Sequence, residues 1–372
     1  MLLHLWSLLC LALAPCLSGL SLLPPPPGRH LVVGDGDLSY GAFQAKSEQQ
    51  RSPDNGEGSL IVSVLESEQQ HRDTYSGSRA NHDAIEGTEG ARVLYGVDAT
   101  NLSAALSAAL PPSPTFSSIT FNYPHWPGKS NLRENRLLLL SFLRSAAPLL
   151  KPYPATVSVA LAEGQGGSSS PTRAAWRQSW QAGSLAAEAG LLLLETSPHT
   201  HLSSYNRSSH RGVDRGFRVG QGEVHTFALP SPACPAADES CRMCSFFELH
   251  VLHSPSAGAL VAAAVAGAAR RAGLEGEVSL RERFGEGPPG GGGKEWAVYE
   301  AVAVGVRAPA TREAAGEVRR GAQEEMAGAG LELRQGGRRS SEQVSNVIPL
   351  ATYRRMQEKW GMLPIPVPAQ AI

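Results

Sequence analysis

The sequence has few cysteines and no excess of charge of either sign. It contains five cysteines. Cys10 and Cys16 lie in an apolar N-terminal stretch, and Cys234, Cys241 and Cys244 cluster in one short segment. This odd-numbered cluster excludes a disulfide framework. The formal net charge of −1 excludes a global basic field for nucleic-acid binding, so any contact with RNA must come from a local patch.

Apolar runs long enough to cross a membrane are lacking after residues 1–23. That first stretch ends at Pro24–Pro27 and has small residues at Cys16 and Ser18, which is typical of a secretory leader with a cleavage site. A membrane anchor is the alternative, although Pro15 and the proline run fit it poorly. We expect a cleaved leader that directs the chain to the secretory route or an organelle, and no stable membrane association afterwards.

The most informative segment is H-L-V-V-G-D-G-D-L-S-Y, His30–Tyr40. A buried-strand pattern breaks into a glycine turn, and Ser39 is then placed to cap a helix. Such a turn lets a nucleotide-type ligand approach the backbone. Two carboxylates in the turn would repel a pyrophosphate, but they suit S-adenosylmethionine, which has hydroxyls and a positive centre. The candidate cofactor-binding residues here are Gly34, Asp35, Gly36 and Ser39.

Strand and helix patterns alternate over residues 29–229 and predict an α/β fold with a doubly wound sheet. The clearest helices are Asn131–Leu150 and Ala174–Ala189, and a strand after the irregular stretch 197–221 is expected to run antiparallel. Six helix-linked strands and an antiparallel seventh are the plan of a Rossmann-like class I methyltransferase. The predicted strands are Arg29–Gly34, Ser59–Leu65, Arg92–Val97, Ser117–Tyr123, Ala155–Leu161, Leu191–Glu195 and Gly222–Leu229.

The pattern changes after a linker at residues 230–245. The order strand, helix, strand, strand, helix, strand predicts a C-terminal ferredoxin-like α+β domain over residues 246–335. Residues 336–372 are expected to form a mostly unpacked tail with a short helix near Tyr353–Lys359. The predicted elements of the domain are Phe246–His253, Ala257–Ala272, Gly276–Phe284, Glu295–Arg307, Thr311–Ala327 and Leu331–Arg334.

Acidic residues follow two further strands. Glu66 comes after L-I-V-S-V-L, where a carboxylate can bind ribose hydroxyls as in dinucleotide folds. Asp98, in Y-G-V-D-A-T, follows the third strand and can reach an adenine. A solvated helix cap is the alternative for each residue, but their occurrence together with the glycine turn favours cofactor binding.

The fourth strand ends in F-N-Y-P-H-W-P-G-K, Phe121–Lys129. Asn122 followed by an aromatic residue and a proline is similar to the N-P-P-Y arrangement of enzymes that methylate planar nitrogens. There an amide and a carbonyl hold the edge of a base while an aromatic ring stacks on its face. A proline-kinked loop is the alternative. The candidate substrate-binding residues are Tyr123, Pro124, Lys129, Arg133 and Arg136, the last three as a local phosphate contact.

Several segments together resemble the 25S ribosomal RNA uridine-N3 methyltransferase-like domain over residues 29–229. They are G-D-G-D-L-S, V-D-A-T-N-L, F-N-Y-P-H-W-P-G-K-S-N-L-R-E-N-R and Y-N-R-S-S-H-R-G. A-L-A-E-G-Q-G-G and W-R-Q-S-W resemble the branch with a C-terminal ferredoxin-fold anticodon-binding domain, and F-G-E-G-P-P-G-G-G-G-K is similar to that domain. One departure is V-S-V-L-E-S, where the family has A-T-S-x-D-S at the end of strand two.

The resemblance implies S-adenosyl-L-methionine as cofactor and methyl transfer to N3 of a uridine in large-subunit ribosomal RNA. It also implies a nucleolar or nuclear location, in contrast to the leader, and contact with tRNA through the C-terminal domain. The uridine N3 proton must leave, and Asp37 and His125 are the candidate bases beside Asn122, with His125 better matched to neutral pH. Alternatively, the pocket orients the nucleophile without a base.

Other candidates are weaker. Trp176 and Trp180 lie one helical turn apart, which favours core packing over base stacking. Tyr205, His210 and Arg211 could close over a substrate or form an exposed loop. The cysteine cluster, with His250 and His253 downstream, invites a zinc site, but the two histidines would point to opposite faces of a strand. We therefore expect a linker with free thiols and no metal.

Two other function classes remain. One is a catalytically inactive S-adenosylmethionine- or RNA-binding protein of the same fold. The other is a small-molecule methyltransferase, which the lack of a basic surface permits and which salt-insensitive substrate binding would support. The leading prediction is an RNA uridine-N3 methyltransferase with an appended RNA-binding module.

Overall fold

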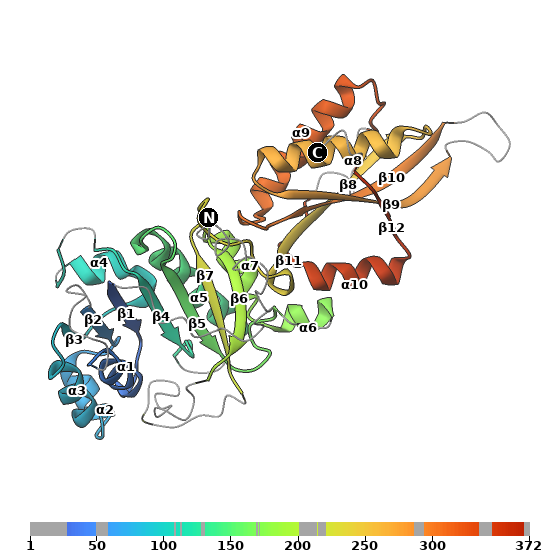
Figure 1. Cartoon of the computed structure of the whole chain (residues 1–372). Helices are drawn as coiled ribbons and strands as arrows, with labels where there is room; N and C mark the ends of the chain where they lie inside the picture. The colour runs from blue at the N-terminus through green and yellow to red at the C-terminus, as the bar shows by residue number, and fades with distance from the viewer. Residues whose placement is uncertain are drawn as a thin grey trace, which may run out of the picture.

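A computed structural model of the chain describes the protein in two lobes, each built on its own β-sheet (Figure 1). Among the residues that it describes, no helix is long and apolar enough to cross a membrane. The leader, Lys129, Tyr205, His210 and Arg211 lie outside the described residues. The described residues are 28–49, 59–107, 109–111, 114–127, 131–168, 170, 172–200, 214, 221–285, 294–334 and 344–367.

The first lobe contains a seven-stranded sheet of order β3-β2-β1-β4-β5-β7-β6. Strand β7 pairs antiparallel with both β5 and β6, and the other pairings are parallel. The class I methyltransferase plan predicted from the sequence is confirmed, and each predicted strand is present to within three residues. The strands are β1 (Arg29–Val33), β2 (Ser59–Ser63), β3 (Ala91–Leu94), β4 (Ser118–Asn122), β5 (Thr156–Leu161), β6 (Leu192–Pro198) and β7 (Glu223–Ala228).

Helices cover both faces of this sheet because neighbouring strand residues point to opposite sides. On one face Leu31 and Val33 pack in a cluster with residues of α4, α5 and α7. On the other face Val32 packs with residues of α1 and α3. The helices are α1 (Ser39–Gln49), α2 (Glu68–Thr74), α3 (Arg79–Glu86), α4 (Leu102–Ser107), α5 (Leu132–Ala146), α6 (Arg173–Gln178) and α7 (Ala182–Glu188), with short 3₁₀ turns η2 (Ala99–Asn101) and η3 (Ala147–Leu149).

The single helix predicted at Ala174–Ala189 is wrong, because the chain breaks between α6 and α7. The backbone N–H of Trp180 donates to Gln165 O in the preceding loop, and Gln181 takes a left-handed φ of 59°. Trp176 and Trp180 are both buried, so core packing was the correct choice for them. They nevertheless lie in different clusters, Trp180 in the first lobe and Trp176 against residues of the second.

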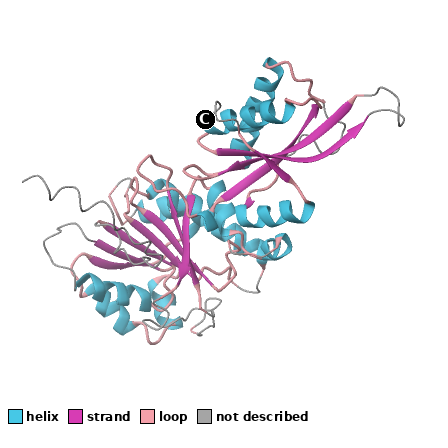
Figure 2. Cartoon of the chain, turned by 45° about the vertical axis from the view of Figure 1, so that its right-hand side comes forward, coloured by secondary structure: helices cyan, strands magenta, loops and turns pink. Residues whose placement is uncertain are grey.

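The second lobe has a five-stranded sheet of order β11-β8-β10-β9-β12. The predicted order β-α-β-β-α is confirmed, while the last predicted strand is reduced to one bridge between Leu333 and Val251. Helices α8 and α9 lie on one side of the sheet and α10 on the other (Figures 1 and 2). The elements are β8 (Met243–Leu252), α8 (Ala257–Arg271), β9 (Glu275–Gly285), β10 (Glu295–Val304), α9 (Arg312–Gly328), β11 (Ile348–Pro349), α10 (Leu350–Trp360) and β12 (Leu363–Ile365).

The prediction of an unpacked C-terminal tail is wrong for residues 344–367. β11 pairs with β8 and β12 pairs with β9, so the segment extends both edges of the sheet. Helix α10 lies between them and buries Leu350, Tyr353 and Gln357. The short helix expected near Tyr353–Lys359 is therefore present as α10, and only its packing against the sheet was missed, because its buried residues include the polar Thr352 and Gln357.

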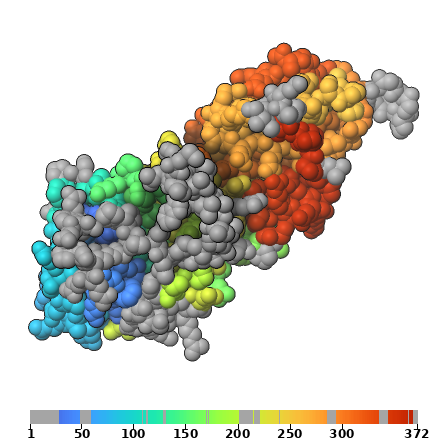
Figure 3. Space-filling view, viewed as in Figure 1, coloured from blue at the N-terminus to red at the C-terminus, as the bar shows by residue number. Residues whose placement is uncertain are grey.

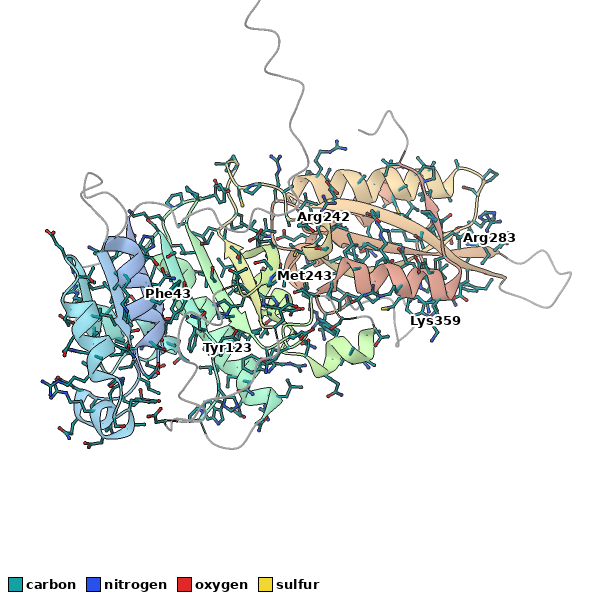
Figure 4. The ribbon with its side chains drawn as sticks, turned by 60° about the horizontal axis from the view of Figure 1, so that its bottom comes forward. Phe43, Tyr123, Arg242, Met243, Arg283 and Lys359 are labelled. Carbon is teal, nitrogen blue, oxygen red and sulfur yellow. The ribbon has the colours of Figure 1, made fainter. Side chains whose placement is uncertain are left out.

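Side chains from both lobes pack together at the junction. Met243 clusters with Ala187 of α7 and with Val347, and it lies between the lobes in Figure 4. Ser184 Oγ donates to Val347 O at 2.8 Å, which links α7 to the segment before β11. The surface of α10 lies on the second lobe in Figure 3. The lobes are therefore joined by a packed interface as well as by the connecting chain.

Candidate cofactor and substrate site

The candidate residues gather where the order of the strands reverses. Strands β1 and β4 are neighbours, and the chain leaves β1 toward β2 on one side but leaves β4 toward β5 on the other. In open α/β sheets, ligands bind in the crevice at such a switch point. The turn after β1 lies at this point, with Glu66 beyond β2 on one side and Asn122 at the end of β4 on the other.

Gly34 begins the turn after β1, at a position where the structure leaves no room for a side chain. Its φ is +65°, and a Cβ atom would lie 2.7 Å from Cε2 of Phe121 on β4. Any side chain would strain the left-handed backbone and displace a ring of the core. Glycine at this position therefore has a packing role beside the Phe121 ring, and cofactor binding at Gly34 stays a prediction.

The carboxylates of the turn bind the first amides of helix α1. Asp37 Oδ1 accepts from the Ser39 N–H at 3.1 Å. Asp35 accepts from the N–H groups of Tyr40 and Gly41 at 3.3 and 2.6 Å. Ser39 is thus the first residue of the helix, and the predicted cap is supplied by these two aspartates. A helix start whose amides are already bonded to carboxylates offers no phosphate site.

Asp35 has an unusual protonation equilibrium. Burial raises its pKa to about 8, and the charge of Asp37 adds to that rise. The hydrogen bonds from Gly41 and Tyr40 act in the opposite direction. Burial prevails because the half-buried carboxylate loses solvent that two amides do not fully replace.

Two residues that sequence reasoning missed fix the turn from outside. His71 Nε2 lies 2.7 Å from Gly36 O, and the imidazole is buried. Asn81 Nδ2 donates to Asp37 O at 2.9 Å. Both come from helices after β2, and no local motif marks residues that bond a turn more than 30 positions away.

The ends of β2 and β3 present different surroundings. Glu66 is half-buried, and Leu65 before it leaves 59% of its surface exposed. Asp98 is exposed and caps η2, where its Oδ1 accepts from the Thr100 N–H at 2.8 Å and from the Thr100 hydroxyl at 2.7 Å. The cap considered from the sequence is therefore observed at Asp98, while no cap engages the Glu66 side chain among the described contacts.

Asn122 and Tyr123 end β4 in an unusual way. Asn122 Nδ2 is buried and makes no well-formed hydrogen bond among the described residues, but the Asn122 side chain lies beside Tyr40, where it acts against the burial that raises the pKa of the Tyr40 hydroxyl. Tyr123 takes a left-handed φ of 50°, a strained conformation for an aromatic residue. Its hydroxyl lies 2.7 Å from Nδ1 of the buried His199, which follows β6. Tyr123 is labelled in Figure 4. His199 was missed because 76 residues separate it from Tyr123.

The loop after Tyr123 is held by helix α5. Asn135, which is buried on α5, accepts the Trp126 N–H at 2.8 Å. His125 Nδ1 lies 2.5 Å from Trp126 O, and Pro124 is buried. The R-E-N-R segment of the sequence therefore has a structural explanation, since its asparagine anchors the loop that carries the candidate base.

The three basic candidates differ in position. Arg133 is exposed near the start of α5. Arg136 donates to the carbonyls of Arg177 and Ser179 at 2.6 and 3.0 Å, and burial lowers its pKa. In the structure, Arg136 therefore binds the carbonyls at the end of α6 and does not stand free to contact a phosphate. Arg133 is the basic candidate left open to solvent, with Lys129 outside the described residues.

The cysteines do not converge. Cys234, Cys241 and Cys244 are buried as free thiols in three separate clusters. Burial raises the pKa of all three thiols, which disfavours the thiolate form that binds metals. In the described part of the chain, no three His, Cys, Asp or Glu side chains are grouped to hold a metal ion.

The residues at the crevice fit S-adenosylmethionine. The amides at the start of α1 are already bonded to Asp35 and Asp37, as expected for a ligand without phosphate. Glu66 offers a carboxylate for hydroxyls, and Leu65 beside it offers an apolar contact for a ring. The buried amide of Asn122, which lies beside Tyr40, offers a donor on the opposite side.

The sheet order and the crevice define the first lobe as a class I methyltransferase fold. Residues 31–211 match the BMT5-like family, described as rRNA (uridine-N3-)-methyltransferase BTM5-like, which confirms the predicted family resemblance over these residues. The chain is 32% identical over 222 residues to ferredoxin-fold anticodon-binding domain-containing protein 1 homolog of Mus musculus. It is 29% identical over 211 residues to the protein of that name in Homo sapiens.

These comparisons differ in coverage. The matches to the mouse and human proteins cover 56% and 55% of this chain but 32% of each relative, so the chain spans about a third of their length. Two solved structures are similar at low level. They are an S-adenosylmethionine-dependent methyltransferase from Clostridium acetobutylicum (9% identity, 55% of this chain and 85% of that one, TM-score 0.30) and the CcbJ methyltransferase from Streptomyces caelestis (14%, 55% and 90%, TM-score 0.30).

Proposed function

We propose that this chain is an S-adenosylmethionine-dependent methyltransferase that acts on N3 of a uridine in large-subunit ribosomal RNA. The observation that carries the proposal is the buried Asn122 amide at the crevice, whose Nδ2 makes no well-formed hydrogen bond among the described residues although the Tyr40 side chain lies beside it. A buried donor without a good acceptor destabilises a protein by about 1–3 kcal/mol. An acceptor atom on a bound ligand would remove that cost. The family description of residues 31–211 supports the same class of reaction.

On the β2 side, the chain's own residues would hold the cofactor. The Gly34–Asp37 turn would receive it along the backbone, and Glu66 would accept hydrogen bonds from ribose hydroxyls. Both contacts of Asp98 with Thr100 use Oδ1, so Oδ2 would be the atom that accepts a hydrogen bond from the adenine. The bound group would supply an electrophilic methyl on a sulfonium, and the Asp37 carboxylate of the turn would favour that positive charge.

On the β4 side, the uracil edge matches the chain's donor. N3 lies between two carbonyls, and Asn122 Nδ2 can donate to one of them. The N3 proton must be accepted by a group near that edge. Asp37 Oδ1 already accepts from the Ser39 amide at 3.1 Å, which favours His125 as the acceptor. Tyr123 and Pro124 shape the wall, and Lys129 and Arg133 would contact phosphates.

The second lobe would supply further RNA contacts, to ribosomal RNA or to tRNA. Its β-α-β-β-α order is that of ferredoxin-like domains, and two relatives carry the ferredoxin-fold anticodon-binding name. The family resemblance implies the nucleolus or nucleus, whereas the apolar N-terminal stretch implies the secretory route or an organelle. Fluorescent tagging of the full chain, with and without residues 1–23, separates these locations.

Isothermal titration of S-adenosylmethionine into the purified chain tests the cofactor, with Gly36→Trp as the blocked control. We expect binding that the control loses, and absence of binding by the wild type would overturn the proposal.

A methyl-transfer assay tests the substrate. Ribosomal RNA from cells lacking the protein is then the substrate, and mass spectrometry detects N3-methyluridine. Asn122→Ala should keep cofactor binding and lose transfer. A protein that binds the cofactor but never methylates RNA would be the inactive alternative.

A further inference from the structure

One tryptophan of the first lobe is exposed in a way that its neighbours are not. The side chains of Trp176, Trp180 and Trp296 are 3–4% exposed, whereas Trp126 is 39% exposed. Trp126 lies four residues after Asn122, in the loop that leaves the carboxyl end of β4. A large aromatic ring left in water at a ligand crevice is a common mark of a binding surface.

The backbone that carries this ring is fixed at several points. The Trp126 N–H donates to Asn135 Oδ1 at 2.8 Å, and Asn135 is itself 3% exposed. The Trp126 carbonyl lies 2.5 Å from His125 Nδ1. Prolines stand at 124 and 127 on either side of these two residues and restrict their backbone further. The loop is therefore pre-organised, while its indole ring remains 39% exposed.

Tyr123, the aromatic residue next to Asn122, is already engaged elsewhere. Its ring stacks on the imidazole of His199 with centroids 5.6 Å apart and planes at 28°. Its hydroxyl is bonded to the same imidazole at 2.7 Å. With one face covered by His199, this ring is a wall of the site. Trp126, three residues further along the chain, is the more exposed of these two aromatic side chains.

Exposed apolar side chains stand on both sides of the turn after β1. Leu65, at the end of β2, is 59% exposed, and Trp126 follows β4. Because β2 and β4 flank β1, the two side chains belong to opposite halves of the crevice. A site that brings a cofactor ring and a substrate ring together needs one apolar surface for each, and the β4 half is the side of Asn122.

We propose that Trp126 is the platform on which the target base of a single-stranded RNA stacks. The identity of that base as uracil rests on the proposed function, whereas stacking itself does not. Asn122 would then bond the edge of the base while the indole covers its face. Every base has a π face, so Trp126 supplies affinity and orientation, and the selection of uracil is left to the amide.

Tryptophan fluorescence tests this directly in the full chain carrying Trp360→Phe, which removes the exposed tryptophan of the second lobe. The probes are a uridine oligonucleotide and an abasic oligonucleotide of equal length. We expect the uridine oligonucleotide to quench the fluorescence and the abasic oligonucleotide to quench it little. In Trp126→Ala the uridine oligonucleotide should cause no such quenching. Anisotropy of the labelled uridine oligonucleotide should show binding weakened roughly 5- to 100-fold in Trp126→Ala. Trp126→Phe should bind nearly as the wild type.

Leu137→Ala is the matched control, because Leu137 is an exposed apolar residue of the same lobe on α5 (54% exposed). It should bind RNA as the wild type does. Unchanged affinity in Trp126→Ala, or binding of the uridine oligonucleotide without quenching, would overturn the inference. Failure of the proposed function reads out separately, as loss of methyl transfer or of cofactor binding by a protein whose Trp126 still responds to RNA.

Discussion

Removal of one buried hydroxyl should loosen the C-terminal segment from the second sheet. Tyr353 on α10 donates its hydroxyl to Glu300 Oε1 of β10 at 2.7 Å, and Glu300 is 1% exposed. Gln357 Nε2 donates to the same hydroxyl oxygen at 3.0 Å and to Ser279 Oγ at 3.0 Å. Tyr353→Phe deletes the donor to Glu300 while it keeps the ring and its packing.

The magnitude follows from the contacts that remain. Arg281 Nη1 lies 3.9 Å from Glu300 Oε2, beyond hydrogen-bond distance, and Gln357 retains its bond to Ser279. The change therefore removes a hydrogen bond to a buried carboxylate, which contributes about 1.5–3 kcal/mol, and leaves the carboxylate poorly compensated. We expect the free energy of unfolding to fall by about 2–3 kcal/mol at pH 7.

The deficit should depend on pH in a direction that can be worked out. Burial raises the pKa of Glu300, and the Tyr353 hydroxyl acts against that rise. The folded state therefore binds a proton more readily than the unfolded state, and this contribution to stability is present at low pH and lost as pH rises. Tyr353→Phe removes what stabilises the charged form, so its deficit should be larger at pH 7–8 than near pH 4.

A double-mutant cycle of Tyr353→Phe and Glu300→Gln measures the pair, with urea unfolding followed by circular dichroism. We expect a coupling free energy of about 1–3 kcal/mol at pH 7 and a smaller value at pH 4. Additive effects to within about 0.5 kcal/mol at pH 7 would refute the reasoning. A deficit that grows toward acid pH would also contradict it, because the sign would then be reversed.

Three further outcomes are expected around the crevice. Gly34→Ala should lower the free energy of unfolding by about 1–3 kcal/mol, measured in urea, and weaken cofactor binding, since its Cβ would lie 2.7 Å from Phe121 Cε2 at a φ of +65°. With its pKa at about 8, Asp35 should make stability fall as pH rises from about 4 to 8, by at most about 1.4 kcal/mol per pH unit, and Asp35→Asn should flatten that slope in thermal unfolding. Asn135→Ala should cost about 1–3 kcal/mol in urea and shift Trp126 fluorescence, because it frees a backbone amide.

The first sheet was predictable because each strand is a short apolar run next to a turn. Leu31 to Val33 and the runs of the other strands alternate with helical patterns, and the order of a doubly wound sheet then follows from handedness and short connections. The break between α6 and α7 was not predictable from periodicity. It depends on Trp180 donating to Gln165, a contact that exists only after the preceding loop has folded.

Candidate site residues at the ends of strands could be predicted from the sequence. Residues that hold the site by hydrogen bonds from distant elements could not. The glycine turn and Asn122 lie at strand ends that the pattern locates. His71, Asn135 and His199 bond the turn, the loop and Tyr123 from other elements, and one sequence cannot pair them. Arg136 was predicted to contact phosphate because of its position in the chain. Its guanidinium instead donates hydrogen bonds to the carbonyls of Arg177 and Ser179 at the end of α6.

The charge at the crevice restricts how an RNA can enter. The carboxylates of Asp37 in the turn and Glu66 on the β2 side would repel a phosphate backbone laid across them. The exposed basic candidate, Arg133, lies instead at the start of α5 beyond the Trp126 loop. The strand would therefore run on the β4 side, and a single base would have to leave its stack to reach the crevice. An exposed ring at the entrance offsets part of the cost of that unstacking, which gives the Trp126 platform a physical reason as well as a position.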